Sequence, residues 1–143
     1  MFVARAFVAL FTAMRMNKSS TFATSSSTPE MVTGWSADGG YGGTNIVSNQ
    51  LKIADAGTGK TVTAACAFTT NVQFNSHYMG IYKNGTLIGT EQVLVPIPST
   101  SGTLNFSLGS QLVAANDVFD MRCRVIGGGT MTVQAAGTFL KVE

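Results

Sequence analysis

The stretch from Ala54 to Thr61 has the residue types of a phosphate-binding loop, because glycines 57 and 59 precede Lys60 and Thr61. Such a loop holds phosphates with backbone N–H groups at the start of a helix. The residues after Thr61 instead alternate between apolar and hydroxyl side chains, which is typical of a strand. We therefore interpret the stretch as a glycine-rich turn between strands, and we expect no nucleotide cofactor.

The other side chains with catalytic potential are few and separated. His77 is the single histidine, so a Ser-His-Asp or Cys-His site would have to include it, yet it falls in a predicted strand. Asp117 and Asp120 are three residues apart at the start of a strand, and their side chains therefore point to opposite faces. A metal site would need more donors than one histidine and two distant cysteines. We predict a protein that is not an enzyme and holds no metal.

The two cysteines, Cys66 and Cys123, are too few for a disulfide framework. Each lies on the apolar face of its own strand pattern, which favours buried free thiols. A single disulfide between them is the alternative.

Length and composition indicate one domain spanning residues 1–143, long enough to enclose a real core. Hydrophobic residues make up 45% of the chain and charged residues only 11%, less than half of the usual share of about 25%. The net charge is +2, and Lys and Arg do not cluster. This balance gives no argument for a nucleic-acid or membrane partner, and no apolar run is long enough to span a membrane.

The strongest local structural signal is Asn84-Gly85, which lies between two β-rich runs. A type I′ hairpin turn requires positive φ at both central residues, and Asn-Gly tolerates this well. The alternation of His77, Met79 and Ile81 before the turn predicts one strand of the hairpin. The segment from Leu87 to Val95 predicts the other.

Period-two patterns predict further strands, to a total of eight to ten, which is typical of a β-sandwich or barrel. They lie at residues 2–12, 31–35, 46–53, 61–69, 103–108, 118–126 and 131–142. The first of these also fits a helical stripe, and its surroundings have the composition of a transit peptide, but we interpret it as a strand of the fold. The apolar faces predict a core of Val62, Cys66, Phe68, Leu104, Phe106, Phe119, Met121, Cys123 and Val125.

The order of these segments resembles the jelly roll of the complement globular-head and tumour-necrosis-factor superfamily. The matching segments are residues 59–68, Lys83-Asn84-Gly85, 104–108, Asn116-Asp117-Val118 and 137–140. Members of the superfamily have a Lys-Asn-Gly hairpin in mid-domain, a Gly-Asp-x-Val start to the penultimate strand and a Phe-rich final strand. Here Asn116 takes the place of that glycine. The resemblance implies an all-β, antiparallel jelly-roll sandwich.

Small, weakly charged versions of this fold look like virion proteins of tailed bacteriophages. This resemblance implies a homotrimeric decoration (cement) protein, made in the host cytoplasm and bound to the major capsid protein on the outer surface of the virion. The alternative is the trimeric receptor- or glycan-binding tip of a phage tail or head fibre. We favour decoration, because the chain shows no shaft sequence before the domain and few loop aromatics other than Trp35 and Tyr41.

A trimer of this kind requires a sheet face with small, weakly polar side chains. We expect Ala65 and Ala67, together with Ala136 and Leu140, to contribute to such a face. The basic residues Arg15 and Lys18 are our candidates for contact with the capsid or a neighbouring subunit.

Overall fold

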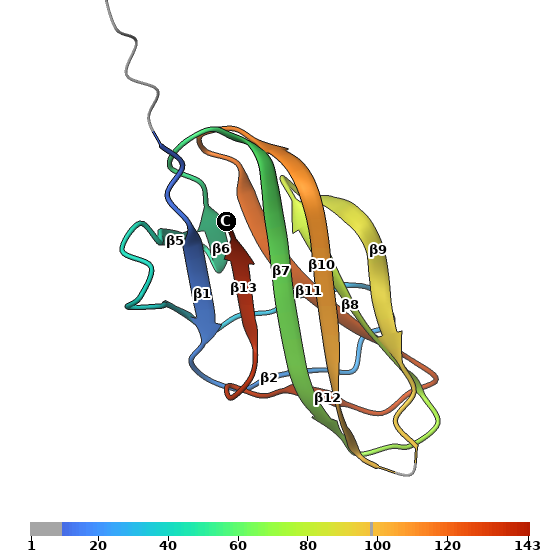
Figure 1. The fold of residues 1–143 in the computed structure, drawn as a ribbon. Helices are drawn as coiled ribbons and strands as arrows, with labels where there is room; N and C mark the ends of the chain where they lie inside the picture. The colour runs from blue at the N-terminus through green and yellow to red at the C-terminus, as the bar shows by residue number, and fades with distance from the viewer. Residues whose placement is uncertain (1–9, 98) are drawn as a thin grey trace, which may run out of the picture.

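The computed structural model describes residues 10–97 and 99–143, which form two antiparallel sheets and no helix (Figure 1). The β7 sheet contains β1 (Met14–Lys18), β2 (Phe22–Thr24), β4 (Trp35–Ala37), β7 (Gly57–Thr70), β10 (Ser101–Val113), β12 (Met131–Val133) and β13 (Phe139–Val142). The β11 sheet contains β3 (Glu30–Met31), β5 (Ile46–Val47), β6 (Gln50–Lys52), β8 (Ser76–Lys83), β9 (Thr86–Leu94) and β11 (Val118–Ile126). The predicted all-β antiparallel sandwich is confirmed. Within the described residues, no helix has the length and apolarity to cross a membrane.

Strand β7 connects most of its sheet. Along one edge it pairs with β10, from Thr69 opposite Ser101 to Gly57 opposite Val113. Along the other edge its first half pairs with β13 and its second half with β12. Strands β1 and β4 continue the sheet beyond β13, and β2 continues it beyond β12. Strand β11 has the same role in the other sheet, with β8 on one edge and β6 and β3 on the other.

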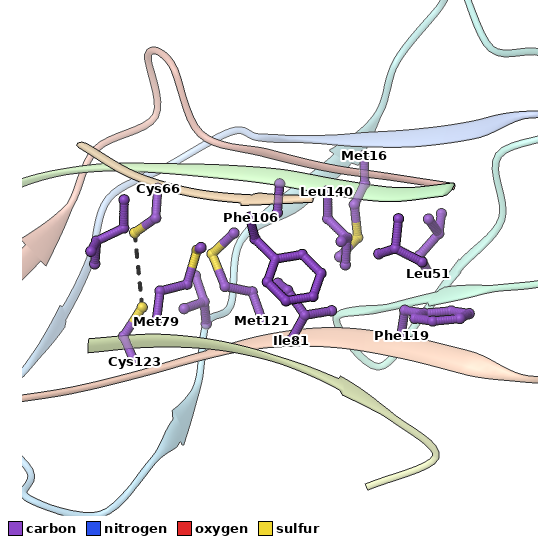
Figure 2. Packing of buried hydrophobic residues seen from close by; sticks show 14 of the residues in the cluster. Met16, Leu51, Cys66, Met79, Ile81, Phe106, Phe119, Met121, Cys123 and Leu140 are labelled. Atoms are coloured by element: carbon purple, nitrogen blue, oxygen red, sulfur yellow. Dashed lines mark hydrogen bonds between the residues drawn. The ribbon is translucent and has the colours of Figure 1, made fainter. Parts of the chain in front are cut away.

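The core lies between the two sheets (Figure 2). Every side chain predicted for the core is buried there, each with an exposed fraction of 5% or less. Met14 and Met16 of β1 and Met79 and Ile81 of β8 are fully buried among them. The alternation of side chains along each strand therefore places one face of each sheet in the core.

The Asn84-Gly85 turn is confirmed as a hairpin, with φ angles of 50° at Asn84 and 81° at Gly85. The Asn84 side chain donates to Asp117 Oδ1 at 2.8 Å and accepts from the backbone N–H of Val118 at 2.9 Å. The turn is thereby fixed to the start of β11. Just before it, Asn116 has a φ of 72°, a conformation that glycine favours and asparagine tolerates.

The first strand differs from our prediction. Residues 2–9 lie outside the described part, residues 10–13 are not in a strand, and Leu10 is 88% exposed. The strand begins at Met14, because Met14 and Met16 provide the inward apolar positions that pair β1 with β13. Residues 46–53 are also not one strand: Ser48 and Asn49 both have positive φ and form the turn between β5 and β6.

Three further segments differ in extent. Residues 131–142 are interrupted at 134–138, so that β12 and β13 are separate strands on the same edge of β7. The segment 31–35 contributes to two strands in opposite sheets, β3 and β4. Strand β10 runs beyond Leu108 to Val113, because register shifts let it remain paired with β7.

Replacing Gly85 with alanine tests the turn. We expect Gly85→Ala to lower the free energy of unfolding by about 1–2 kcal/mol, because alanine is strained at positive φ. Gly39→Ala is the control, since a Cβ there meets no atom within 4 Å and its φ is ordinary. The control should change stability by less than about 0.5 kcal/mol in urea unfolding. Equal effects of the two substitutions would contradict the type I′ turn.

Candidate subunit interface

The outer face that β7 and β10 share from Thr61 to Thr69 and from Thr103 to Ser107 carries no ionisable side chain. Its outward positions alternate with the buried residues of each strand, so they are fixed by the register of the pair. They are Thr61, Thr63, Ala65, Ala67 and Thr69 on β7, and Thr103, Asn105 and Ser107 on β10. We call these eight positions the uncharged face. Its side chains are small hydroxyl, methyl and amide groups.

Two charged side chains beside this face, on β1 and β13, have ionic partners, and Lys60 near the start of β7 lies 4.4 Å above the Phe11 ring. The Arg15 guanidinium lies 3.3 Å from Asp38 and 4.2 Å above the Phe139 ring. Lys141 forms an ion pair with Glu143 at 2.6 Å. The two ion pairs balance the charges of Arg15 and Lys141 within the subunit.

The outer face of the β11 sheet is different, because two arginines of β11 lie across it. Each guanidinium bonds a carboxylate and covers a tyrosine ring. Arg122 lies 2.7 Å from a carboxylate oxygen of Asp120 and 4.3 Å from the centre of the Tyr82 ring. Arg124 lies 2.6 Å from a carboxylate oxygen of Glu91 and 4.0 Å from the centre of the Tyr78 ring. We call these two sets the arginine clusters. The hydrogen bonds to Asp120 and Glu91 raise the pKa of the two guanidinium groups. Ionic contacts thus lie on the outer face of the β11 sheet and are absent from the uncharged face of the β7 sheet.

A shallow hollow of about 370 Å³ opens on the uncharged face between β7, β10 and the connection from β12 to β13. Ala67, Thr103 and Ala136 line it. Gln134 also lines it and was not identified from the sequence. Ala65 lies further along β7, opposite Phe139 of β13, and is 8% exposed. Ala65, Ala67 and Ala136 therefore lie on or beside one surface, and their part in a subunit contact stays a prediction.

Leu140 does not belong to this surface, and our prediction for it is wrong. It is fully buried and points into the core (Figure 2). The interruption at 134–138 changes the alternation, so the outward residues of β13 are Phe139 and Lys141. Counting from the start of β13, instead of through the interruption, would have identified Phe139.

No protein-family model and no curated protein matches this chain. Solved structures do match it. The Eiger TNF of S. frugiperda superposes with a TM-score of 0.66 at 9% identity, over 92% of this chain and 90% of that chain. Murine APRIL gives a TM-score of 0.62 at 12% identity, over 93% of this chain and 98% of that one. The fold is tumour-necrosis-factor-like. At these identities the likeness concerns the fold alone.

In this tumour-necrosis-factor-like sandwich, Lys18 is not a surface cation, which corrects our expectation. Its exposed fraction is 5%, because it shares the inward side of β1 with Met14 and Met16. Its ammonium group donates to the carbonyl oxygens of Ser20 and Gly34. Burial lowers the pKa of Lys18. Arg15 is partly exposed beside Asp38, and its contact with a capsid or a neighbouring subunit stays a prediction.

The stretches considered for chemistry lie in strands and in the core. Within residues 54–61, strand β7 begins at Gly57 and passes through Lys60, so a strand and not a helix follows the glycines. His77 is fully buried and stacks on Phe68 with ring centroids 5.0 Å apart. Burial lowers its pKa and favours the neutral ring. Among residues 10–97 and 99–143, no three His, Cys, Asp or Glu side chains converge as metal donors.

The role of Lys18 can be tested with Lys18→Met. We expect a loss of about 1–3 kcal/mol in the free energy of unfolding, because the Ser20 carbonyl would lose the ammonium donor, whereas the Gly34 carbonyl still accepts from Ser19. Lys52→Met on β6 is the control, since Lys52 is only partly buried, and it should cost less than about 0.5 kcal/mol. Chemical denaturation of both variants gives the comparison. A Lys18 variant as stable as the control would show that the buried ammonium group has no structural role.

Proposed function

We propose that this chain is a non-enzymatic structural protein that forms a homotrimer through the uncharged face and decorates the outer surface of a bacteriophage capsid. The observation that carries the proposal is that none of the eight positions of the uncharged face has an ionisable side chain, while the outer face of β11 carries Arg122 and Arg124 with their carboxylate partners. Covering small, uncharged side chains with another subunit buries no unpaired charge. The lack of charge on this face agrees with the depletion of charged residues at the core of subunit interfaces.

A threefold assembly fits the proposed location. Capsid shells present local threefold points, and a trimer seated there contacts several capsid subunits at once. Three weak contacts then act together, because the second and third form at high effective concentration. The Phe139 ring under Arg15 and the hollow beside Ala67 are the features that we assign to the contact between copies.

The end of the sandwich that we assign to the major capsid protein carries exposed apolar side chains. It includes Phe74, Val95, Ile97 and Ile126, which are 68%, 38%, 56% and 40% exposed. At the start of β8, Ser76 pairs with Ile126 of β11, and the next residue, His77, pairs with Leu94 of β9. The loop with Phe74, the end of β9 and the end of β11 therefore lie together at one end of the sandwich. Phe74 also has a φ of 66°, which is rare for an aromatic residue and is typical of functional sites. We call this region the Phe74 end.

The alternative function is a receptor- or glycan-binding fibre tip, and Phe74 is the observation that favours it. Carbohydrate sites use exposed aromatic rings. Trp35 does not provide one, because it packs against the core and its Nε1 donates to the carbonyl of Val32 at 2.7 Å. Phe74 is well exposed in a loop and was not identified from the sequence. In this alternative, the Phe74 end contacts the host surface instead of the capsid.

The subunit contact can be tested by adding a charge to the uncharged face. We expect Ala67→Glu to convert the trimer into folded monomers of about the 15.0 kDa chain mass, because three buried carboxylates would repel each other. Val93→Glu on β9 is the matched control, since it adds the same charge to an exposed position of the β11 sheet. Light scattering after gel filtration distinguishes them. Dissociation by both variants, or by neither, would contradict the assigned face.

The capsid contact can be tested with Phe74→Asn on phage heads stripped of the protein. Asparagine tolerates positive φ, so the variant should fold and trimerise while its occupancy on heads falls at least about tenfold. Leu112→Asn is the control, because Leu112 is as exposed as Phe74, at 68%. It lies at the end of β10 that is far from the Phe74 end.

Electron microscopy of the reconstituted particles shows where the copies lie. Threefold positions on the head support decoration. Copies confined to the tail would overturn decoration and support the fibre-tip alternative.

A further inference from the structure

The two cysteines face each other across the middle of the sandwich (Figure 2). Cys66 belongs to β7 and Cys123 to β11, which are in different sheets. Their Sγ atoms are 3.8 Å apart, and both side chains have an exposed fraction of 0%. Both thiols are free in this structure.

The surroundings of the pair limit its chemistry. Leu104 pairs with Cys66, and Met79 pairs with Cys123, so apolar residues lie beside each thiol. No third metal-donor side chain converges on the pair among the described residues. The contact with Cys66 and the burial of the thiol raise the pKa of Cys123. Because the thiolate is the reactive form, the pair is inert once the core has closed.

We propose that Cys66 and Cys123 are the site of an inter-sheet disulfide, formed when the folding or locally opened chain meets a low-molecular-weight disulfide such as oxidised glutathione. One cysteine thiolate attacks the glutathione disulfide and releases one glutathione. The second cysteine then attacks the mixed disulfide and releases the other. Two protein thiols are oxidised and one glutathione disulfide is reduced, and the two glutathione thiols take up the two protons.

The bond would require only a short approach of the two sulfur atoms, from 3.8 Å to about 2.05 Å. It would close a long loop, because the cysteines are 57 positions apart in the chain. Such a cross-link restricts the unfolded chain and stabilises the fold. It would also join the central strands of the two sheets covalently. We expect the melting temperature to rise by about 10 °C.

The test is to refold the full chain in two ways, with a mixture of oxidised and reduced glutathione and with a reductant. After oxidative refolding, we expect a proteolytic peptide pair linked through Cys66 and Cys123, and no thiol that can be alkylated after unfolding. The linked protein should melt about 10 °C higher than the reduced protein. The Cys66→Ala and Cys123→Val variants are the controls, and the redox mixture should leave their melting temperatures unchanged.

The comparison of oxidised and reduced wild-type protein decides the proposal even if a variant fails to fold. Free thiols after oxidative refolding would overturn it. Disulfides formed only between different chains would also overturn it, as would an internal disulfide that does not raise the melting temperature. None of these results depends on trimer formation or on the location of the protein.

Discussion

The structure depends on the pairing of one long strand along both of its edges. Strand β7 spans 14 residues, holds β10 on one side and holds β13 and β12 on the other. Its inward residues, among them Val62, Cys66 and Phe68, supply the centre of one half of the core. The strands that carry the outer surface are therefore positioned by β7. A change that shifted its register by one residue would exchange the core face and the uncharged face.

The two outer surfaces of the sandwich differ because charge is distributed between them unequally. On the β11 sheet, carboxylates satisfy the guanidinium groups of Arg122 and Arg124, and tyrosine rings lie beneath them. The two arginines of this surface therefore have their ionic partners within the subunit. The uncharged face has no internal ionic contacts, and its small side chains leave a hollow beside Ala67. This contrast, and not the likeness of the fold, is the physical basis of the proposed assembly.

The sequence was most informative where strands are long. On β7 and β11 the alternation extends over enough residues to set the inward positions, so the core was predicted correctly. Short strands gave errors. Lys18 is a polar residue at an inward position of a five-residue strand, and Leu140 follows an interruption that changes the alternation. The exposure and positive φ of Phe74 result from loop packing and have no local pattern that could be recognised.

The arginine clusters were also beyond a local analysis, because Glu91 and Arg124 are 33 positions apart and meet only through sheet pairing. The proposed subunit interface depends on the pairing of β7 with β10, so trimer formation is the central claim to test. Sedimentation equilibrium of the unmodified chain over a wide concentration range is the most direct measurement. We predict a single species at three times the chain mass of 15.0 kDa. A stable species at the mass of one chain would contradict the account.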